Sequence, residues 1–177
     1  RTPINGICGM VDMADYYAVA FLDEGIELRK AGIDKPILIL GYTDPSDYMD
    51  LMRWDIRPAM YDVDEAQQLS DDAVSMGKRA KIHIKVDTGM GRIGFTCDDA
   101  GVNNIEKIWK MPGIEIEGIF THYAKADEYD KTAANGQLEK FRWINDRLAE
   151  IGIHIPVRHI SNSAGIMEMD NSDFDMV

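Results

Sequence analysis

The sequence predicts an α/β fold built on a parallel β-sheet. Short runs of apolar and β-branched residues recur along the 177 residues, and segments of helical character separate them. In Leu22–Lys30 acids precede bases, the order that the helix dipole favours. Strands that alternate with helices are typical of βαβ units, whose right-handed crossovers bring the carboxyl ends of the strands to one side of the sheet. A doubly wound sheet and an incomplete barrel both fit this pattern.

Six runs are expected to form strands: Tyr17–Ala20, Pro36–Leu40, Arg57–Tyr61, Ile82–Val86, Gly118–His122 and Val157–Ile160. A seventh strand is expected to begin at Asp175–Val177. The expected helices are Leu22–Lys30, a helix from Ser46 or Asp47 to Trp54, Asp64–Gly77, Asp98–Lys110 and Thr132–Ile151. Apolar residues at three- and four-residue steps give the last of these helices one apolar face. At 45% apolar residues, a chain of this length can bury the core of a single domain.

The stretch Lys81–Phe95, KIHIKVDTGMGRIGF, is the most informative part of the chain. Its first half alternates apolar with longer polar residues, which predicts a strand. The glycines that follow allow a sharp turn and a close approach of the backbone to a ligand. The turn carries Arg92 at the carboxyl end of the strand, where α/β folds present groups to small ligands. Burial of Lys85 on the same strand would lower the pKa of its amine and favour the neutral form.

Two further strand ends carry polar residues that could contribute to a site. His122 ends one strand, although a single histidine there is more often a packing residue than a catalytic one. Asn162 and Ser163 end another strand, with small polar side chains that could cradle a phosphate. The same two residues are slightly more typical of an ordinary turn and the start of a helix.

Composition excludes several classes of function. The 31 acidic residues outnumber the 19 basic ones, for a net charge of −12, which disfavours binding to nucleic acids or anionic membranes. The two cysteines, Cys8 and Cys97, show no zinc-ligand spacing, and no metal-binding loop is recognised. No apolar run approaches the roughly 20 residues of a membrane span, and RTPINGICGM lacks the apolar core of a signal peptide. A soluble cytoplasmic protein is expected.

Several separated blocks resemble the alanine racemases, pyridoxal-phosphate enzymes whose N-terminal domain is a (β/α)8 barrel. The blocks are YAVAFLDEGIELRKAGI, PILILG, KVDTGMGRIGF, THYAKADE with QLEKF downstream, and HISNSAGIM. They occur in the same order over essentially the whole chain. The resemblance implies that residues 1–177 are a fragment of that barrel domain, an α/β partial TIM barrel. The first strand, most of the last strand and the C-terminal β domain of the family are expected to lie outside it.

The resemblance also implies roles for individual residues. Arg92 would contact the phenolic-oxygen side of pyridoxal 5'-phosphate and the substrate carboxylate, and a carbamylated Lys85 would brace Arg92 by a charge-assisted hydrogen bond. His122 would support the pyridine ring. The remaining expected site residues are Asn162 and Ser163 at the cofactor phosphate and Asp127 at the substrate entryway.

In the family, the Schiff-base lysine lies in a VKANAYGHG-like motif on the first strand, and the second-base tyrosine lies in the C-terminal domain. An arginine in a DMVR pattern faces the pyridine nitrogen, and the present sequence ends at the valine of that pattern, Val177. Since these residues are not in the sequence, we expect this chain alone to be inactive.

The intact parent is expected to interconvert L-alanine and D-alanine through a pyridoxal phosphate aldimine by two-base proton transfer. It would supply D-alanine for peptidoglycan and act as a cytoplasmic homodimer on a small amino acid. A serine or broad-specificity racemase and a non-catalytic pyridoxal-phosphate-binding barrel are the alternatives. A related basic amino-acid decarboxylase is disfavoured by the GMGR turn and the HYAKADE block.

Overall fold

The computed structural model of the protein describes residues 14–170 and 174–177. In these residues the strands are β1 (Tyr17–Val19), β2 (Ile37–Ile39), β3 (Ile56–Met60), β4 (Ala80–Asp87), β5 (Phe95–Thr96), β6 (Ile114–Phe120) and β7 (Val157–His159). The strands pair in parallel in the order β1-β2-β3-β4-β6-β7, while β5 pairs with the end of β4. This order follows the chain without reversal. Because the strand order of a doubly wound sheet reverses near its middle, the sequential order indicates part of a barrel.

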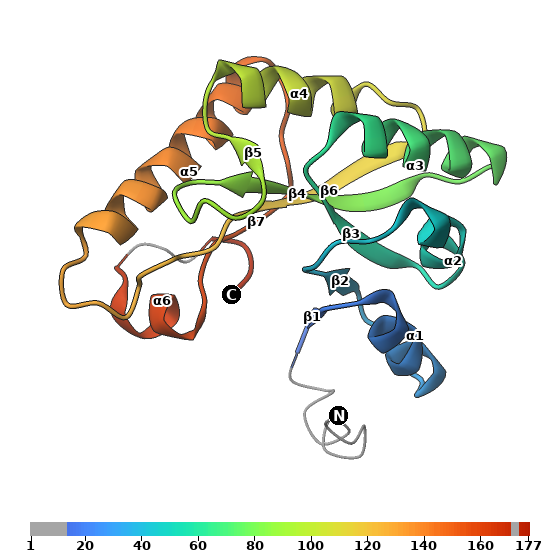
Figure 1. The fold of residues 1–177 in the computed structure, drawn as a ribbon, viewed down its shortest axis with the longest axis horizontal. Coiled ribbons are helices and arrows are strands. Elements are labelled where there is room, and N and C mark those ends of the chain that lie inside the picture. Colours follow the sequence, from blue (N-terminus) through green and yellow to red (C-terminus); the bar gives the residue numbers. More distant parts are fainter. Residues whose placement is uncertain (1–13, 171–173) are drawn as a thin grey trace.

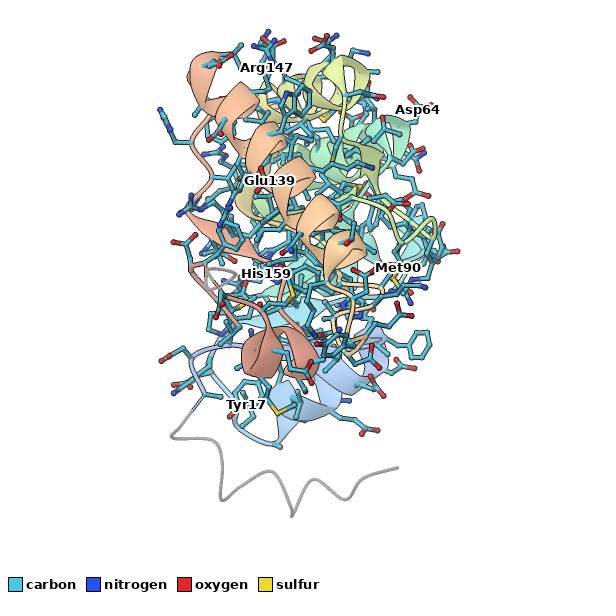
Figure 2. The ribbon with its side chains drawn as sticks, turned by 90° about the vertical axis from the view of Figure 1, so that its left-hand side faces the viewer. Tyr17, Asp64, Met90, Glu139, Arg147 and His159 are labelled. Atoms are coloured by element: carbon cyan, nitrogen blue, oxygen red, sulfur yellow. The ribbon has the colours of Figure 1, made fainter. Side chains whose placement is uncertain are left out.

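The helices lie outside the curved sheet (Figure 1). They are α1 (Leu22–Lys30), the 3-10 helix η2 (Pro45–Asp47), α2 (Tyr48–Arg53), α3 (Val63–Ser75), α4 (Asp99–Trp109), α5 (Thr132–Glu150) and α6 (Ser163–Glu168). The long helix α5 presents Glu139 and Arg147 on its outer surface (Figure 2). The prediction of an α/β partial (β/α)8 barrel is confirmed. Within the described residues, every helix is too short or too polar to span a lipid bilayer.

Aspartates begin two of the outer helices. The side chain of Asp62 accepts hydrogen bonds from the backbone N–H groups of Asp64 and Glu65 at 2.8 and 3.0 Å, and Asp98 accepts one from Gly101 at 2.9 Å. These bonds satisfy backbone donors that have no partner inside the helix. Both helices therefore begin directly at the end of an extended segment. The connection from that segment to the helix is short as a result.

The predicted strand at Asp175–Val177 is wrong. The backbone N–H groups of Asp175 and Met176 both approach the carbonyl of Arg158, at 3.0 and 3.3 Å. A strand beside β7 would distribute its hydrogen bonds over successive residues. The segment instead folds against one carbonyl, and the carboxylate of Asp175 accepts from Nε of Arg158 at 2.7 Å.

A register shift in the sheet determines which side chains face the barrel interior. Ile82 pairs with Ile116, but the next residue, His83, pairs with Gly118. Glu117 is therefore an extra residue in β6, as in a β-bulge. A Cβ atom at Gly118 would lie 2.4 Å from the His83 ring, so the two strands approach closely only because residue 118 is glycine.

Candidate functional site

The glycine turn after β4 is held by the carboxylate of Asp87. Its Oδ1 accepts hydrogen bonds from the backbone N–H groups of Gly89 and Gly91 at 2.9 and 3.1 Å. Burial raises the pKa of this carboxyl, but the backbone hydrogen bonds outweigh burial and lower it overall. Gly91 has a φ of 69°, a left-handed conformation that favours glycine. The turn leaves Arg92 exposed, and within the described residues its guanidinium has no hydrogen-bond partner.

Lys85 is buried near the carboxyl end of β4, with 4% of its surface exposed. Its Nζ lies 4.4 Å from the centroid of the Phe120 ring on the neighbouring strand β6. Burial, and then the positive charge of Arg92, lower the pKa of the amine to about 8, whereas the charge of Asp87 acts to raise it. A substantial fraction of the Lys85 amine is therefore neutral and nucleophilic at mildly alkaline pH.

His122 lies in the loop that follows β6 and is half-buried. Burial lowers the pKa of its imidazole, and the nearby positive charges of Lys85 and Arg92 lower it further. The three residues thus lie within electrostatic range of one another, although they come from a strand, a glycine turn and a different loop. The structure brings these predicted site residues together.

A buried glutamine on α5 joins the two loops that carry Arg92 and His122. Nε2 of Gln137 donates to Oγ1 of Thr88 at 3.1 Å and to the carbonyl of His122 at 2.9 Å. Its Oε1 accepts from the backbone N–H of Ala124 at 2.9 Å. Every hydrogen bond of this amide is therefore used to fix one loop relative to the other.

Replacing Gln137 with glutamate should destabilise the protein by about 2 kcal/mol, because a carboxylate cannot donate to Thr88 or to the His122 carbonyl and is costly to bury. Urea unfolding followed by tryptophan fluorescence measures this change. Gln67→Glu is the matched control, since Gln67 is exposed on α3 and, among the described residues, donates only to Asp71. Equal stability of the two variants would contradict the role of Gln137 in fixing the two loops relative to each other.

Asn162 and Ser163 have different local roles. The side chain of Asn162 accepts from the backbone N–H of Gly165 at 2.9 Å and donates to the carbonyl of Tyr123 at 3.4 Å, so it caps α6 and holds the loop. Ser163 is the first residue of α6 and is exposed. Within the described residues its hydroxyl forms no hydrogen bond. Ser163 therefore has its hydroxyl donor available to a ligand, and Nδ2 of Asn162 has the second of its two N–H donors available.

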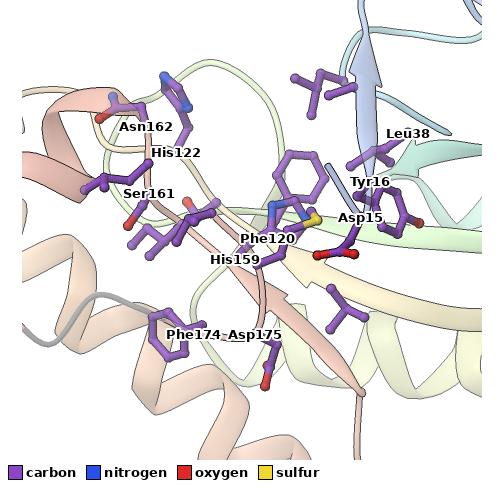
Figure 3. Close-up of a pocket in the computed structure, with 18 of the residues that line it drawn as sticks. Asp15, Tyr16, Leu38, Phe120, His122, His159, Ser161, Asn162, Phe174 and Asp175 are labelled. Atoms are coloured by element: carbon purple, nitrogen blue, oxygen red, sulfur yellow. The ribbon is translucent and has the colours of Figure 1, made fainter. Parts of the chain in front are cut away.

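A cavity of about 1000 Å³ opens on the inner face of the sheet. Figure 3 shows His122, Ser161 and Asn162 on one side of it and Asp15, Tyr16 and Leu38 on the other. Phe120 and His159 lie between these two groups, with their rings stacked at 4.7 Å. The cavity wall thus includes two of the predicted site residues, while Lys85 lies against the Phe120 ring.

Four predicted residues are not part of the cavity wall: Lys85, Arg92, Asp127 and Ser163. Arg92 and Ser163 are exposed beyond its lining, at the carboxyl ends of β4 and β7. Asp127 is exposed in the loop after β6 and forms no hydrogen bond or ion pair with the described residues. Its role at a substrate entryway stays a prediction.

Sequence reasoning missed the polar side chains of the barrel interior. His83 is fully buried, and its Nδ1 lies 3.0 Å from Nε2 of His159. Tyr16 and Glu117 extend this group of contacting polar residues. The one available signal was that His83 lies two residues before Lys85, on the same face of a strand.

Residues 9–177 match the family model described as "Alanine racemase, N-terminal domain". The chain belongs to the alanine racemase family. It is 46% identical over 164 residues to an alanine racemase of Clostridium perfringens strain SM101, and this match covers 93% of the chain and 42% of that racemase. The chain therefore spans less than half the length of such curated relatives.

Solved alanine racemases share this half-barrel. The one from Clostridium difficile 630 has a TM-score of 0.95 and 38% identity, over 98% of the chain and 48% of that structure. The alanine racemase of Bacillus anthracis, solved "with bound L-Ala-P", has a TM-score of 0.79 and 33% identity, over 90% of the chain and 41% of that structure. The racemase family thus accounts for both the sequence blocks and the strand order.

Proposed function

We propose that this chain forms the barrel part of the active site of an alanine racemase that uses pyridoxal 5'-phosphate. The observation that carries the proposal is the grouping of Lys85, Arg92 and His122 at the carboxyl ends of the strands, beside a cavity of about 1000 Å³. Active sites of (β/α)8 barrels lie at this end. The bound L-Ala-P of the Bacillus anthracis relative supports a small amino acid as substrate.

The residues present fit a phosphorylated cofactor. A phosphate needs hydrogen-bond donors, and Ser163 supplies an exposed hydroxyl without a partner in the described residues, while the exposed guanidinium of Arg92 is available to the phenolic-oxygen side of the cofactor. Ser163 would bind the phosphate, and Asn162 would hold the loop that presents it. When bound, pyridoxal phosphate withdraws electrons from the amino acid and acidifies its Cα proton.

The remaining roles concern binding and orientation. Arg92 would bind the substrate carboxylate and the phenolic-oxygen side of the cofactor through its planar fork of donors. The neutral amine of Lys85 would react with carbon dioxide and lose a proton, which would give a carbamate. Such a negative group would hold Arg92 in place by a charge-assisted hydrogen bond. His122 would support the pyridine ring, and Asp127 would lie at the substrate entryway.

The finer features of the whole protein belong to the same proposal. We propose that residues 1–177 are part of the N-terminal barrel domain, and that the bases that move the Cα proton, a lysine and a tyrosine, lie outside them. The whole protein would be a cytoplasmic homodimer that supplies D-alanine for peptidoglycan. The similarity to racemases along nearly the whole chain supports this assignment.

The test is racemisation by the whole protein that contains this chain. Incubation with L-alanine should yield D-alanine, measured with a D-amino-acid oxidase, and the visible absorbance of the protein should show bound pyridoxal phosphate. L-serine is assayed in parallel, because faster turnover of serine would reassign the substrate. Cofactor binding without turnover of either amino acid would instead favour a non-catalytic barrel.

Ser163→Ala should weaken retention of the cofactor about tenfold, because the phosphate loses a hydroxyl donor worth roughly 1 to 1.5 kcal/mol. The measurement is the loss of visible absorbance during dialysis of the whole protein. Ser75→Ala is the control, since Ser75 is an exposed serine of α3 that donates to the carbonyl of Asp72 at 2.7 Å. Full retention of the cofactor by Ser163→Ala would discard the phosphate role.

A further inference from the structure

A second cavity, of about 360 Å³ and here called the basal cavity, lies where β3 and β4 begin. Its wall includes Ala80, the first residue of β4, whereas the candidate site lies beyond Asp87, the last residue of that strand. The length of the strand, roughly 23 Å, therefore separates the two places. The charged residues of the wall are Arg53, Asp55, Lys78, Arg79 and Lys81.

Two adjacent cations of this wall keep their charge uncompensated. Nζ of Lys78 donates to the carbonyl of Met52 at 3.1 Å, and Nη2 of Arg79 donates to the carbonyl of Ile114 at 2.6 Å. Among the described residues, neither cation forms an ion pair. Because a carbonyl carries no net charge, these bonds orient the two side chains without neutralising them. An ammonium has three N–H donors and a guanidinium has five, so both groups keep donors for a ligand.

The other charged groups of the wall have carboxylate or guanidinium partners. Arg53 pairs at 2.7 Å with an aspartate of its own helix, and the carboxylate of Asp55 lies 2.9 Å from Nη1 of the buried Arg57. Nζ of Lys81 lies 3.5 Å from Oε1 of Glu117, but Oε2 of the same carboxylate accepts from Arg57 at 2.9 Å. Lys81 is therefore only partly neutralised. The basal cavity thus has an excess of positive charge.

We propose that the basal cavity binds a small anion that carries a phosphate group, with Lys78 and Arg79 as the principal donors. A phosphate offers several acceptor oxygens and more than one negative charge, so it can accept from both side chains at once. The planar fork of Arg79 matches two phosphate oxygens. A carboxylate with a single charge gains less from two neighbouring cations. The volume lies within the range of small-molecule sites, which begins at about 300 Å³.

The charge of the whole chain favours a small anion over a nucleic acid. The sequence carries a net charge of −12, so a long polyanion that extends over the surface is repelled. At physiological ionic strength, charges are screened beyond about 8 Å. An anion held inside the basal cavity therefore interacts mainly with Lys78, Arg79 and Lys81.

The test is calorimetric titration of the whole protein with inorganic phosphate and, in parallel, with glycerol phosphate, in about 0.15 M potassium chloride. One anion should bind per chain at the basal cavity. Tighter binding of glycerol phosphate would assign an organic phosphate as the ligand, and tighter binding of inorganic phosphate would assign the free ion. Lys78→Gln and Arg79→Gln should each weaken binding about tenfold, because each variant loses a charged hydrogen-bond donor. Both side chains are exposed, so the variants should fold.

Lys107→Gln is the matched control, since Lys107 is exposed on α4 and its Nζ lies 3.3 Å from Oδ1 of Asn104. It should bind the anion as the wild type does. Failure of the wild type to bind either anion at this salt concentration would overturn the proposal. Equal affinities of Lys78→Gln and Lys107→Gln would overturn it as well, because the binding would then follow general charge.

Ser163→Ala separates the basal cavity from the proposed cofactor site, which also takes a phosphate. This variant should bind both anions with unchanged affinity, because Ser163 lies at the other end of the strands. If Ser163→Ala loses the anion while Lys78→Gln keeps it, the ligand occupies the cofactor site and the proposal fails. Racemisation is not measured in this experiment. A protein that binds the anion but racemises no amino acid would refute the proposed function and keep the basal cavity as an anion site.

Discussion

Replacing Arg92 with lysine should lower the kcat of the whole racemase about 100-fold, since a displaced positioning group costs roughly that factor. Lysine keeps the positive charge but loses the planar pair of donors that binds a carboxylate at two points. The variant should fold normally, because Arg92 is exposed and has no hydrogen-bond partner within the described residues. Steady-state kinetics measure the loss of turnover, and thermal unfolding of the same samples shows whether stability has changed.

Arg53→Lys is the matched control for this experiment. Arg53 is also exposed and pairs with Asp50 at 2.7 Å on α2, an exposed ion pair of the kind that contributes little to stability. Its replacement should leave both turnover and the unfolding temperature nearly unchanged. If Arg92→Lys behaves like Arg53→Lys, Arg92 does not act in the site.

The sequence predicted the fold best where apolar and polar residues alternate regularly along a strand. Ile82–Val86 lies inside β4, and the GMGR turn follows where the glycines indicated. The strand predicted at Gly118–His122 begins instead at Ile114. Glu115 and Glu117 interrupt the apolar run there, and the bulge at Glu117 breaks the period of two that such predictions use.

The strand order was left open by periodicity because local patterns contain no information about which strands are neighbours. The strand order β1-β2-β3-β4-β6-β7, which distinguishes a barrel from a doubly wound sheet, is a long-range property. Resemblance to the racemases supplied it, as several blocks matched in the same order along the chain.

The sequence could predict those residues of the candidate site that lie near the end of a strand. Lys85, Arg92 and His122 lie near strand ends in the sequence, and parallel topology brings such ends together. The contacts of Tyr16 with His83 and Glu117 span 67 and 101 residues. No spacing rule links residues that far apart, so these contacts could not be predicted from the sequence.

Glu117→Ala should give the largest loss of stability among single changes in the barrel interior, about 3 kcal/mol. Its carboxylate balances Arg57, of which 4% of the side chain is exposed, through a contact of 2.9 Å. Removal of the acid leaves a guanidinium in the interior whose only remaining counterion in the described part of the chain is the exposed Asp55. Glu139→Ala is the control, because its ion pair with Arg142 at 3.3 Å is exposed and should contribute less than about 1 kcal/mol.

The same carboxylate predicts how stability depends on pH. The folded-state pKa of Glu117 lies below its unfolded value of about 4.3. A group with a depressed pKa stabilises the fold fully above the unfolded value, and this contribution is lost as pH falls through the folded value. The difference in unfolding free energy between wild type and Glu117→Gln should therefore be constant near neutral pH and shrink in acid.

Urea unfolding of the whole protein at several pH values between neutral and acid conditions measures that difference. If this difference in unfolding free energy stays constant down to strongly acidic pH, the loss of stability in Glu117→Gln comes from altered side-chain packing and not from the lost charge. Arg57→Met combined with Glu117→Ala separates these causes further, because removing both charges leaves no unpaired ion in the interior. The double variant should be more stable than Glu117→Ala alone. If it is less stable, the packing of the two side chains, rather than their charge pairing, holds β3 and β6 together.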